Sequence, residues 1–325
     1  MSPFGYFTPA EEVAKAFADR IKGRTFLVTG TSAEGLGAHA AISLAREGAG
    51  HIVLVSRSKA KTEPVLQEIA TISPSTKTTF VTCELSDFDS VRAAAQQIND
   101  DTSIPHIDVV INNAGIMNVK EYTLDKQGNE LTFSSNHLGH FLLTNLILPK
   151  ILASGPGARI VNVSSRGYRI SNVWFDDPAF SAGAKYDGWS AYGQSKTANI
   201  LFSFELARRL ASKGVKAYSV HPGGIYTTGL ATHLRNEENA FAAIEVVALR
   251  NTGLPFGGVD SPPKSLTQGT SSLLAAALDP EIEDRSGSYV KDCQIEDTYP
   301  YALDPENAKK LWELSEKLVG QKFEY

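Results

Sequence analysis

The chain has 325 residues, of which 42% are hydrophobic and 21% charged, the ordinary balance of a globular protein with a sizeable core. Its formal net charge is -5, from 31 basic and 36 acidic side chains without a block of like charges, which argues against a nucleic-acid-binding or membrane-binding surface. The two cysteines, Cys83 and Cys293, lie far apart without CxxC spacing, so they indicate neither a disulfide framework nor a zinc site and favour a reducing, cytoplasmic setting.

The N-terminal segment, residues 1–22, mixes charged residues with small apolar ones and contains no apolar core of signal-peptide length. The best candidate for a membrane span, Phe141–Leu152, is interrupted by Asn145, Pro149 and Lys150 and falls well short of the roughly 18 residues that a span needs. We therefore expect a soluble protein in which residues 1–22 form an extension to the fold.

Strands and helices are predicted to alternate from residue 25 to residue 220. Short apolar and β-branched runs predict six strands: Thr25–Val28, His51–Val55, Thr79–Glu84, Ile107–Ile111, Arg159–Val163 and Val215–Val220. Helical spacing predicts the segments between them: Ala38–Glu47, Glu63–Ile72, Ser90–Ile98, Phe133–Leu148 and Tyr192–Leu210. This rhythm favours parallel strands with helices on both faces, that is, a Rossmann-type, doubly wound α/β fold.

The C-terminal third departs from this alternation. Residues from Ile225 to about Thr267 combine apolar helical patches with a Gly/Pro-rich stretch, Gly253–Pro263, and are predicted to form an inserted substrate flap. A C-terminal amphipathic helix is predicted over Asn307–Leu318. Because no internal repeat or low-complexity linker divides the chain, we expect a single domain over residues 1–325.

A glycine-rich turn lies between the first predicted strand and the first predicted helix, which is the context that a dinucleotide-binding turn requires. Gly30 permits a sharp turn, Gly35 permits close approach of a pyrophosphate, and Gly37 allows the helix to pack against the strand. Backbone N–H groups along the turn and the helix start, around Ser32 and Leu36, then face the phosphates. Such turns also merely connect elements, but the position after the first strand favours nucleotide binding.

Arg57 ends the second predicted strand, where an enzyme that prefers NAD would place an acidic residue to bind the ribose hydroxyls. A guanidinium at this position can instead form charge-assisted hydrogen bonds to a 2′-phosphate, so we expect NADP(H) as the cofactor. The alternative is a solvated loop arginine that pairs with Glu63.

Further short motifs stand at the ends of the predicted strands and on the helices that follow. After the glycine turn they are, in chain order, Asn112-Asn113-Ala114-Gly115, Asn136, Ser165, Tyr192-Gly193-Gln194-Ser195-Lys196 and Pro222-Gly223. This ordered set resembles the short-chain dehydrogenase/reductase family, and the resemblance covers the chain from about Thr25 to Pro222. Two longer phrases, residues 136–144 and 191–196, are most similar to the retinol-dehydrogenase-like branch.

Tyr192 and Lys196 stand four residues apart on a predicted helix, so both side chains project from one face. A phenol normally has a pKa of about 10, and an adjacent ammonium is expected to bring it nearer to neutral pH. Tyr192 can then give a proton to a carbonyl oxygen or take one from an alcohol. The resemblance implies that Lys196 also binds the nicotinamide ribose hydroxyls. The surrounding motifs disfavour the alternative, an exposed aromatic residue beside an i,i+4 cation.

Ser165 and Asn136 complete the catalytic group that the resemblance implies. A serine at the end of the fifth strand can hydrogen-bond the substrate oxygen and stabilise charge developing on it. Ser164 is the neighbouring alternative, but the family pattern places the catalytic hydroxyl second in this pair. The resemblance implies that Asn136 holds a water that relays protons to the lysine, whereas its alternative role is to bond a helix backbone.

The resemblance also implies the remaining cofactor contacts. They are Glu84, Leu85, Asn113, Ala114, Gly115, Pro222, Gly223, Ile225 and Thr227. Two features depart from the family pattern. Four residues rather than three separate Gly30 from Gly35, which leaves open which backbone amides meet the phosphates. Glu84 stands where the family usually has an aspartate that contacts adenine.

The segment from Ser165 to Tyr192 spans 27 positions, longer than the common family spacing, and is rich in aromatic residues. These are Trp174, Phe175, Phe180, Tyr186 and Trp189. They either line a hydrophobic substrate pocket or form a packed surface loop. Elsewhere, His137, His140 and His221 have no carboxylate or cysteine at ligand spacing, so we expect core or capping histidines and no metal.

These expectations combine into an NADP-dependent oxidoreductase that interconverts a ketone or aldehyde and an alcohol, with a lipophilic small molecule as substrate. Fold alone does not prove activity, so one alternative is a non-catalytic NADP-binding sensor or scaffold. Another is a related short-chain epimerase or dehydratase. Family members often assemble through the helices carrying Asn136 and Tyr192, but no decisive interface stripe is present here, so monomer and homo-oligomer both stay open.

Overall fold

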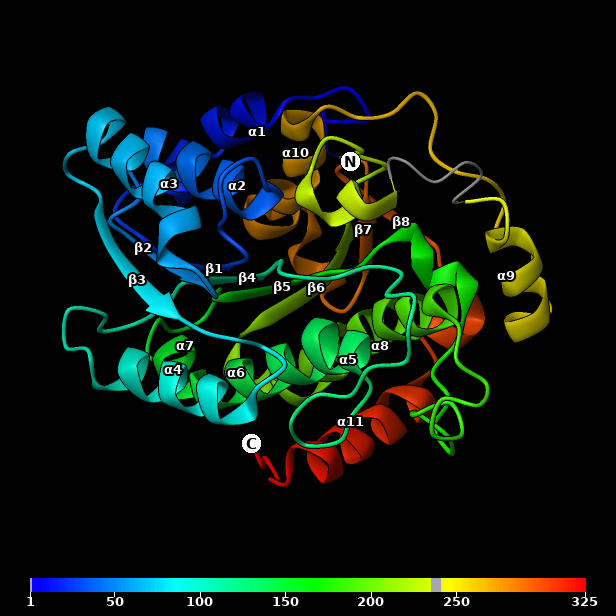
Figure 1. The fold of residues 1–325 in the computed structure, drawn as a ribbon. Coiled ribbons are helices and arrows are strands. Elements are labelled where there is room, and N and C mark those ends of the chain that lie inside the picture. Colours follow the sequence, from blue (N-terminus) through cyan, green and yellow to red (C-terminus); the bar gives the residue numbers. More distant parts are fainter. Residues whose placement is uncertain (1, 235–240) are drawn as a thin grey trace.

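The described residues of this computed structural model, 2–234 and 241–325, form an eight-stranded sheet with helices on both faces (Figure 1). The strands are β1 Thr25–Thr29, β2 His51–Ser56, β3 Lys77–Thr82, β4 Val109–Asn112, β5 Arg159–Val163, β6 Lys216–His221, β7 Tyr289–Lys291 and β8 Gln294–Glu296. Their spatial order is β3-β2-β1-β4-β5-β6-β7-β8, and neighbours are parallel except for β7 and β8. This arrangement confirms the predicted doubly wound α/β fold.

The direction of strand order reverses between β1 and β4. Val28 of β1 aligns with Leu54 of β2 on one side and with Ile111 of β4 on the other. The loops after β1 and β4 therefore leave toward opposite faces of the sheet, and open α/β sheets bind their ligands in the crevice that this divergence creates at the carboxyl ends of the strands. The topology alone predicts a site beyond Thr29 and Asn112.

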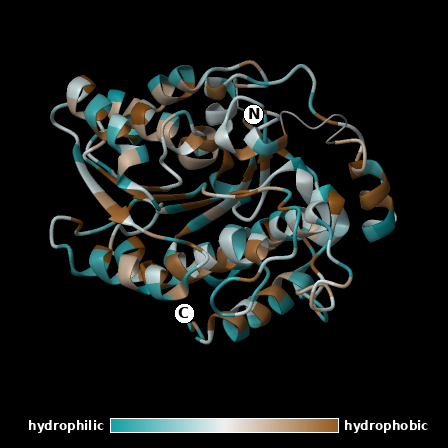
Figure 2. Cartoon of the chain, in the orientation of Figure 1, coloured by the Kyte–Doolittle hydropathy of each residue, from teal (hydrophilic) through white to brown (hydrophobic). Residues whose placement is uncertain are grey.

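Two hydrophobic cores fill the space between the sheet and its helices. One face carries α1 Ala10–Ala16, α2 Leu36–Arg46, α3 Lys59–Ile72 and α10 Leu266–Leu278, and the other carries α4 Phe88–Asp100, α6 Gly139–Leu146, α7 Leu148–Leu152, α8 Gly188–Arg209 and α11 Pro305–Val319 (Figure 1). Successive strand residues point to opposite faces, so Phe26 and Val28 join one core and Leu27 the other. Figure 2 accordingly shows hydrophobic strands between helices of mixed hydropathy.

The C-terminal helix α11 covers the outer side of α8 and of the segment that carries Asn136. Trp312 of α11 packs edge-on against Phe141, with ring centroids 5.0 Å apart. The guanidinium of Arg209 lies 4.1 Å from the centroid of the same indole ring. The hydroxyl of Ser315 lies 2.7 Å from Nε2 of His137. Helix α11 confirms the prediction of a C-terminal helix and begins at Pro305, two residues before the predicted start at Asn307.

Several elements differ from the predictions. The predictions omitted β7, β8, α1, α10 and α9 Ile244–Thr252. Helix α8 begins at Gly188 rather than Tyr192, because Asp187 caps it by accepting hydrogen bonds from the N–H groups of Trp189 and Ser190. The helix predicted over residues 133–148 is divided into α5 Leu131–Phe133, a π-helical turn over Ser134–Leu138, α6 and α7.

The structure adds detail to two expectations, the N-terminal extension and the substrate flap. The segment expected as an extension, of which residues 2–22 are described, contributes Phe4 and Val13 to the core beneath α10. The predicted flap contains α9 and the first residues of α10, whereas residues 235–240 lie outside the described part of the chain. Within the described ranges, no helix combines the length and the apolar character needed to cross a lipid bilayer.

Candidate active site

A cavity of about 790 Å³ lies at the carboxyl ends of the central strands. Sixteen of the predicted site residues line it: Gly30, Ser32, Gly35, Leu36, Arg57, Glu84, Leu85, Asn113, Ala114, Gly115, Ser165, Tyr192, Lys196, Pro222, Gly223 and Ile225. The other three, Gly37, Asn136 and Thr227, do not line it. Gly37 and Asn136 stand behind its wall, whereas Thr227 is exposed and its neighbour Thr228 takes the place on the wall. The sheet thus brings together motifs that are far apart in the sequence.

The glycine turn packs against the loop that follows β4. Gly30 has φ 73° and donates its N–H to the carbonyl of Val55 at 2.9 Å. The amide Nδ2 of Asn113 donates to the carbonyl of Thr29 at 2.8 Å. The extra residue of the turn leaves Glu34, a non-glycine residue, at φ 66°. The turn is therefore held by backbone contacts that leave little room for side chains.

Gly37 lies where the helix start meets this loop, and we expect Gly37→Ala to disturb the turn. A Cβ there would stand 2.6 Å from both Asn113 Nδ2 and the carbonyl oxygen of Gly30. Overpacking of this kind costs about 1–3 kcal/mol, so we expect a lower free energy of unfolding and about tenfold weaker NADPH binding. Fluorescence titration and thermal unfolding measure the two effects. Gly5→Ala is the control, because a Cβ there meets nothing within 4 Å, and equal NADPH affinities in the two variants would contradict the prediction.

Arg57 lies at the end of the cavity that β2 and β3 form. Its guanidinium pairs with Glu84 at 3.4 Å, and the Arg57 side chain is 68% exposed. The predicted alternative partner, Glu63, instead accepts a hydrogen bond from Gln67. Lys61, in the first turn of α3, lines the same part of the cavity and was not predicted. Its signal in the sequence was the run of three cations, Arg57, Lys59 and Lys61, that follows the second strand.

Tyr192 and Ser165 both line the cavity, and their side chains are hydrogen-bonded to each other. Burial raises the pKa of Tyr192 to about 12, and a hydrogen bond with the Ser165 side chain opposes part of that rise. The N–H of Gly167 donates to Oγ of Ser165 at 2.9 Å, which fixes the serine. Ser164 is buried and donates to the backbone carbonyl of Lys196 at 2.7 Å, so it holds α8 in place. This geometry favours Ser165 over Ser164 for the substrate oxygen.

Lys196 lies one helical turn after Tyr192, with Nζ 5.5 Å from the phenol ring centroid and donating to the carbonyl of Val163 at 3.1 Å. The prediction that Lys196 lowers the pKa of Tyr192 was wrong for this structure. Burial is the largest cause of the shift, and it raises the pKa of that phenol. Burial also lowers the pKa of Lys196 to about 8, because the charged ammonium is desolvated. At neutral pH the phenol is therefore protonated and able to donate a proton.

The pKa of Lys196 predicts a pH dependence of cofactor binding. A polyanionic cofactor favours the charged form of Lys196. At a pH where Lys196 of the free protein is neutral, cofactor binding is therefore coupled to uptake of a proton by this lysine. Affinity for NADPH is therefore expected to be highest below pH 8, the region of the Lys196 pKa, and to fall at higher pH by up to about tenfold per unit. Dissociation constants measured from neutral to alkaline pH test this expectation. A flat profile, or an unchanged slope in Lys196→Met, would contradict it.

Asn136 is completely buried and links two parts of the site. Its side-chain oxygen accepts from the N–H of Ile116 at 2.8 Å, and its amide donates to the carbonyl of Ile116 and to Oγ of Ser195, each at 2.9 Å. Its own carbonyl lies 3.0 Å from Nδ1 of His140. Asn136 thus ties the loop after β4 to α8, and its relay of protons stays a prediction.

Three of the five aromatic residues between Ser165 and Tyr192 pack on one another, whereas Trp189 lies in α8 with its ring centroid 6.3 Å from that of Tyr192. The ring centroids of Trp174 and Phe180 are 4.9 Å apart, and those of Phe180 and Tyr186 are 5.8 Å apart. None of the five aromatic residues lines the cavity, which favours the packed loop over the substrate pocket. Other apolar residues, which the sequence did not single out, line the cavity beyond Tyr192: Met117, Val119 and Leu230.

The three histidines have protein partners. Nε2 of His140 lies 2.8 Å from Thr29 Oγ1, and Nε2 of His221 lies 2.7 Å from a carboxylate oxygen of Asp260. His137 contacts Ser315, as described above. Within residues 2–234 and 241–325, no cluster of three or more His, Cys, Asp or Glu side chains could hold a metal ion.

Known proteins show similarity over almost the whole chain. A family model described as short chain dehydrogenase matches residues 24–239. Retinol dehydrogenase 14 of Homo sapiens is 36% identical over 311 residues, covering 92% of this chain and 87% of that protein. Retinol dehydrogenase 13 of Homo sapiens is 35% identical over 300 residues, covering 92% and 86%. A solved structure of an uncharacterized protein from Mycobacterium paratuberculosis has a TM-score of 0.69 and 31% identity, covering 94% of this chain and 96% of that one.

Proposed function

Because the chain belongs to the short-chain dehydrogenase/reductase family, we propose that it is an NADP-dependent oxidoreductase that interconverts a ketone or aldehyde and an alcohol. The family and the retinol-dehydrogenase-like branch were both predicted from the sequence, and both predictions are confirmed. As a short-chain dehydrogenase/reductase the chain acts on CH–OH groups. The coenzyme form, the substrate class and the individual residue roles are our proposal.

One observation carries the proposal: the Ser165 and Tyr192 side chains, Lys196 and the glycine turn all face a single cavity. A dinucleotide fits this cavity because the turn at Gly30 and Gly37 has no space for Cβ atoms, and because backbone N–H groups at the start of α2 are free to meet phosphates. The bound nicotinamide supplies or accepts the hydride. The protein then has to hold the carbonyl and handle one proton.

In the proposed reduction, Tyr192 donates its phenolic proton to the carbonyl oxygen, since burial keeps that phenol protonated. The Ser165 hydroxyl donates to the same oxygen and stabilises the charge that develops on it. Lys196 holds the nicotinamide ribose and provides a positive charge on the side of the phenol. In the oxidation direction the same phenol accepts the proton of the alcohol.

The preference for NADP rests on charge at the end of β2. Arg57 and Lys61 both line this part of the cavity, and no acidic residue ends the strand. Two cations suit a 2′-phosphate better than a pair of hydroxyl groups. The proposed lipophilic substrate rests on Met117, Val119 and Leu230, which line the same cavity as Ser165 and Tyr192.

The test is consumption of NADPH by the purified protein with a panel of aldehydes and ketones that differ in apolar length. Retinal belongs in this panel, because relatives of the chain are named retinol dehydrogenases. We expect turnover with NADPH and kcat/KM that rises with apolar length. Tight NADPH binding without turnover of any member would favour the sensor or scaffold instead. Product analysis that finds an epimer or an alkene would favour the epimerase or dehydratase.

A further inference from the structure

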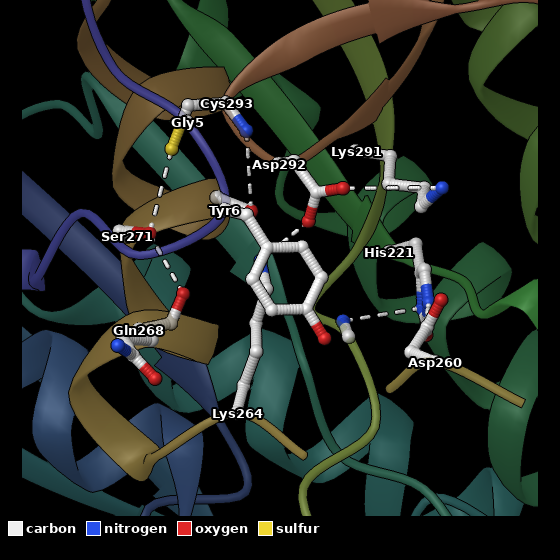
Figure 3. Close-up of polar contacts among 12 residues, drawn as sticks. Gly5, Tyr6, His221, Asp260, Lys264, Gln268, Ser271, Lys291, Asp292 and Cys293 are labelled. Atoms are coloured by element: carbon white, nitrogen blue, oxygen red, sulfur yellow. Dashed lines mark hydrogen bonds and ion pairs between the residues drawn. The ribbon is translucent and has the colours of Figure 1, made fainter. Parts of the chain in front are cut away.

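A short segment, residues 257–264, crosses behind the cofactor loop Pro222–Gly224, and we call it the strap. The N–H of Lys264 donates to the carbonyl of Gly224 at 2.9 Å. A Cβ on Gly223 would lie 2.6 Å from Cδ of Lys264, so the two segments are in direct contact. Figure 3 shows His221, Asp260 and Lys264 close together at this crossing. The strap therefore packs against a loop whose residues Pro222 and Gly223 line the cavity.

The Asp260 carboxylate lies at the centre of this contact, with its side chain only 6% exposed. Its Oδ1 accepts from Nη1 of Arg166 at 3.0 Å, and its Oδ2 lies 2.7 Å from Nε2 of His221. Arg166 directly follows Ser165, and His221 directly precedes Pro222. A single carboxylate thus joins the segment that carries the catalytic hydroxyl to the loop that contacts the cofactor.

The hydrogen-bond pattern assigns the state of the His221 ring. Nδ1 of His221 accepts from the N–H of Gly223 at 3.3 Å, so the ring proton is on Nε2 and is donated to Asp260. Burial by itself would raise the pKa of Asp260, but the hydrogen bonds and charges of His221 and Arg166 hold that pKa well below its usual range. The carboxylate therefore accepts from two donors at once, one on each oxygen, which favours its ionised form.

The far end of the strap has its own anchor. Nζ of Lys264 lies 2.5 Å from a carboxylate oxygen of Asp292 in the turn between β7 and β8, and the Lys264 side chain is fully buried. The ring of Tyr6 covers this ammonium at 4.6 Å (Figure 3). Arg166 also donates to the carbonyl of Gly257, at the near end of the strap, at 2.8 Å. The strap is thus held at both ends, and Asp260 is the strap residue whose side chain binds both Arg166 and His221.

We propose that Asp260 is a positioning residue, which acts through Arg166 and His221 to hold Ser165 and Gly223 in the relative placement that hydride transfer needs. The inference rests on the proposed function. Small displacements of reacting groups cost rate much more than they cost binding. The cofactor's phosphates and adenine are expected to bind at the glycine turn and around Glu84, which Asp260 does not touch. Loss of this carboxylate should therefore lower kcat and leave cofactor affinity nearly unchanged.

Asp260→Asn is the first test. Arg166 and His221 donate to two different carboxylate oxygens, and in the Asn amide one of these oxygens becomes an NH2 group that only donates. One of the two donors would therefore face another donor, and the other ring nitrogen of His221 is already used by Gly223. We expect kcat with NADPH and a carbonyl substrate to fall at least about tenfold, and the dissociation constant of NADPH to stay within about threefold. An unchanged kcat, or an equal loss in NADPH affinity, would overturn the proposal.

Two substitutions of His221 separate positioning from a general loss of packing. Gln can place a donor where Nε2 stands and so keep the bond to Asp260, whereas Asn can place an acceptor near Nδ1 for Gly223 but cannot reach Asp260. We expect His221→Gln to keep kcat within about threefold and His221→Asn to lose about as much as Asp260→Asn. The opposite order of kcat values would overturn the proposal. This comparison of the two His221 variants can still be made if Asp260→Asn fails to fold.

Asp108→Asn is the matched control, because Asp108 is a similarly buried carboxylate at the amino end of the sheet. Its side chain is 11% exposed and lies 3.3 Å from Nε of Arg24. We expect this variant to lower the melting temperature and to leave kcat unchanged. Hydrogen exchange adds a readout that needs no substrate: residues 257–264 should exchange faster in Asp260→Asn and not in Asp108→Asn. If the wild-type protein reduces no carbonyl, the proposed function fails; equal exchange or equal kcat overturns only the role of Asp260.

Discussion

Replacing Tyr192 by phenylalanine is expected to lower kcat for carbonyl reduction by about 10³-fold while NADPH still binds with near-wild-type affinity. The substitution removes the phenolic proton donor that faces the cavity beside Ser165, and a positioned acid of this kind contributes about 10²–10⁴-fold to rate. The phenyl ring keeps the packing of α8, so the fold should persist. Steady-state kinetics and fluorescence titration with NADPH measure the two quantities.

A matched control for this variant is Tyr218→Phe. Tyr218 is also buried and also donates its hydroxyl to the protein, to the carbonyl of Ile282 at 2.8 Å, but it lies outside the cavity. We expect a modest loss of stability and no loss of kcat. A Tyr192→Phe protein that retains more than about a tenth of wild-type kcat would show that another group supplies the proton.

Changing Arg57 to aspartate is expected to shift the preference between the two coenzymes by about 100-fold toward NADH, measured as the ratio of kcat/KM values. The substitution removes a cation that would meet the 2′-phosphate and adds an acid that would repel it and bind free ribose hydroxyls. Because the Arg57 side chain is 68% exposed, part of its contribution is screened, and we expect the NADPH preference of the wild type to weaken at high salt.

Two further variants sharpen this coenzyme test. Glu84→Gln releases Arg57 from its 3.4 Å ion pair, so NADPH should bind more tightly than in the wild type. Arg46→Asp changes charge equally, but Arg46 pairs with Glu68 on the surface and does not line the cavity, so it should leave the ratio unchanged. A wild-type protein that prefers NADH would contradict the assignment of Arg57 before any variant is made.

The longer buried strands were predictable because a run of five or six apolar and β-branched residues is typical of a buried strand. The predicted bounds of His51–Val55 and Arg159–Val163 agree with the structure to within one residue, and both strands are wholly buried. In contrast, β7 and β8 have three residues each, too few for a pattern. Helix α10 escaped prediction because all its residues from Gly269 to Leu278 are buried, so they show no regular alternation of polar and apolar side chains that would reveal a helix.

Most of the candidate site was predictable because its residues stand at strand ends or on the helix that carries Tyr192 and Lys196. The parts that were missed depend on tertiary contacts. Lys61 reaches the cavity only because α3 begins directly after β2, and Asp260 contacts His221 and Arg166 only because a Gly/Pro-rich segment folds back over the cofactor loop. The raised pKa of Tyr192 was also unpredictable, since it follows from how deeply α8 is buried.

The position of α11 decides which surfaces are available to a second copy of the chain. Trp312 is buried against Phe141, and Ser315 against His137, so α11 covers this side of the segment that carries Asn136. Full burial of one large apolar side chain is worth about 1.5–3 kcal/mol, so peeling α11 away would expose several such contacts at once. A second copy that packed on this side of the segment would first have to displace α11 and lose these contacts.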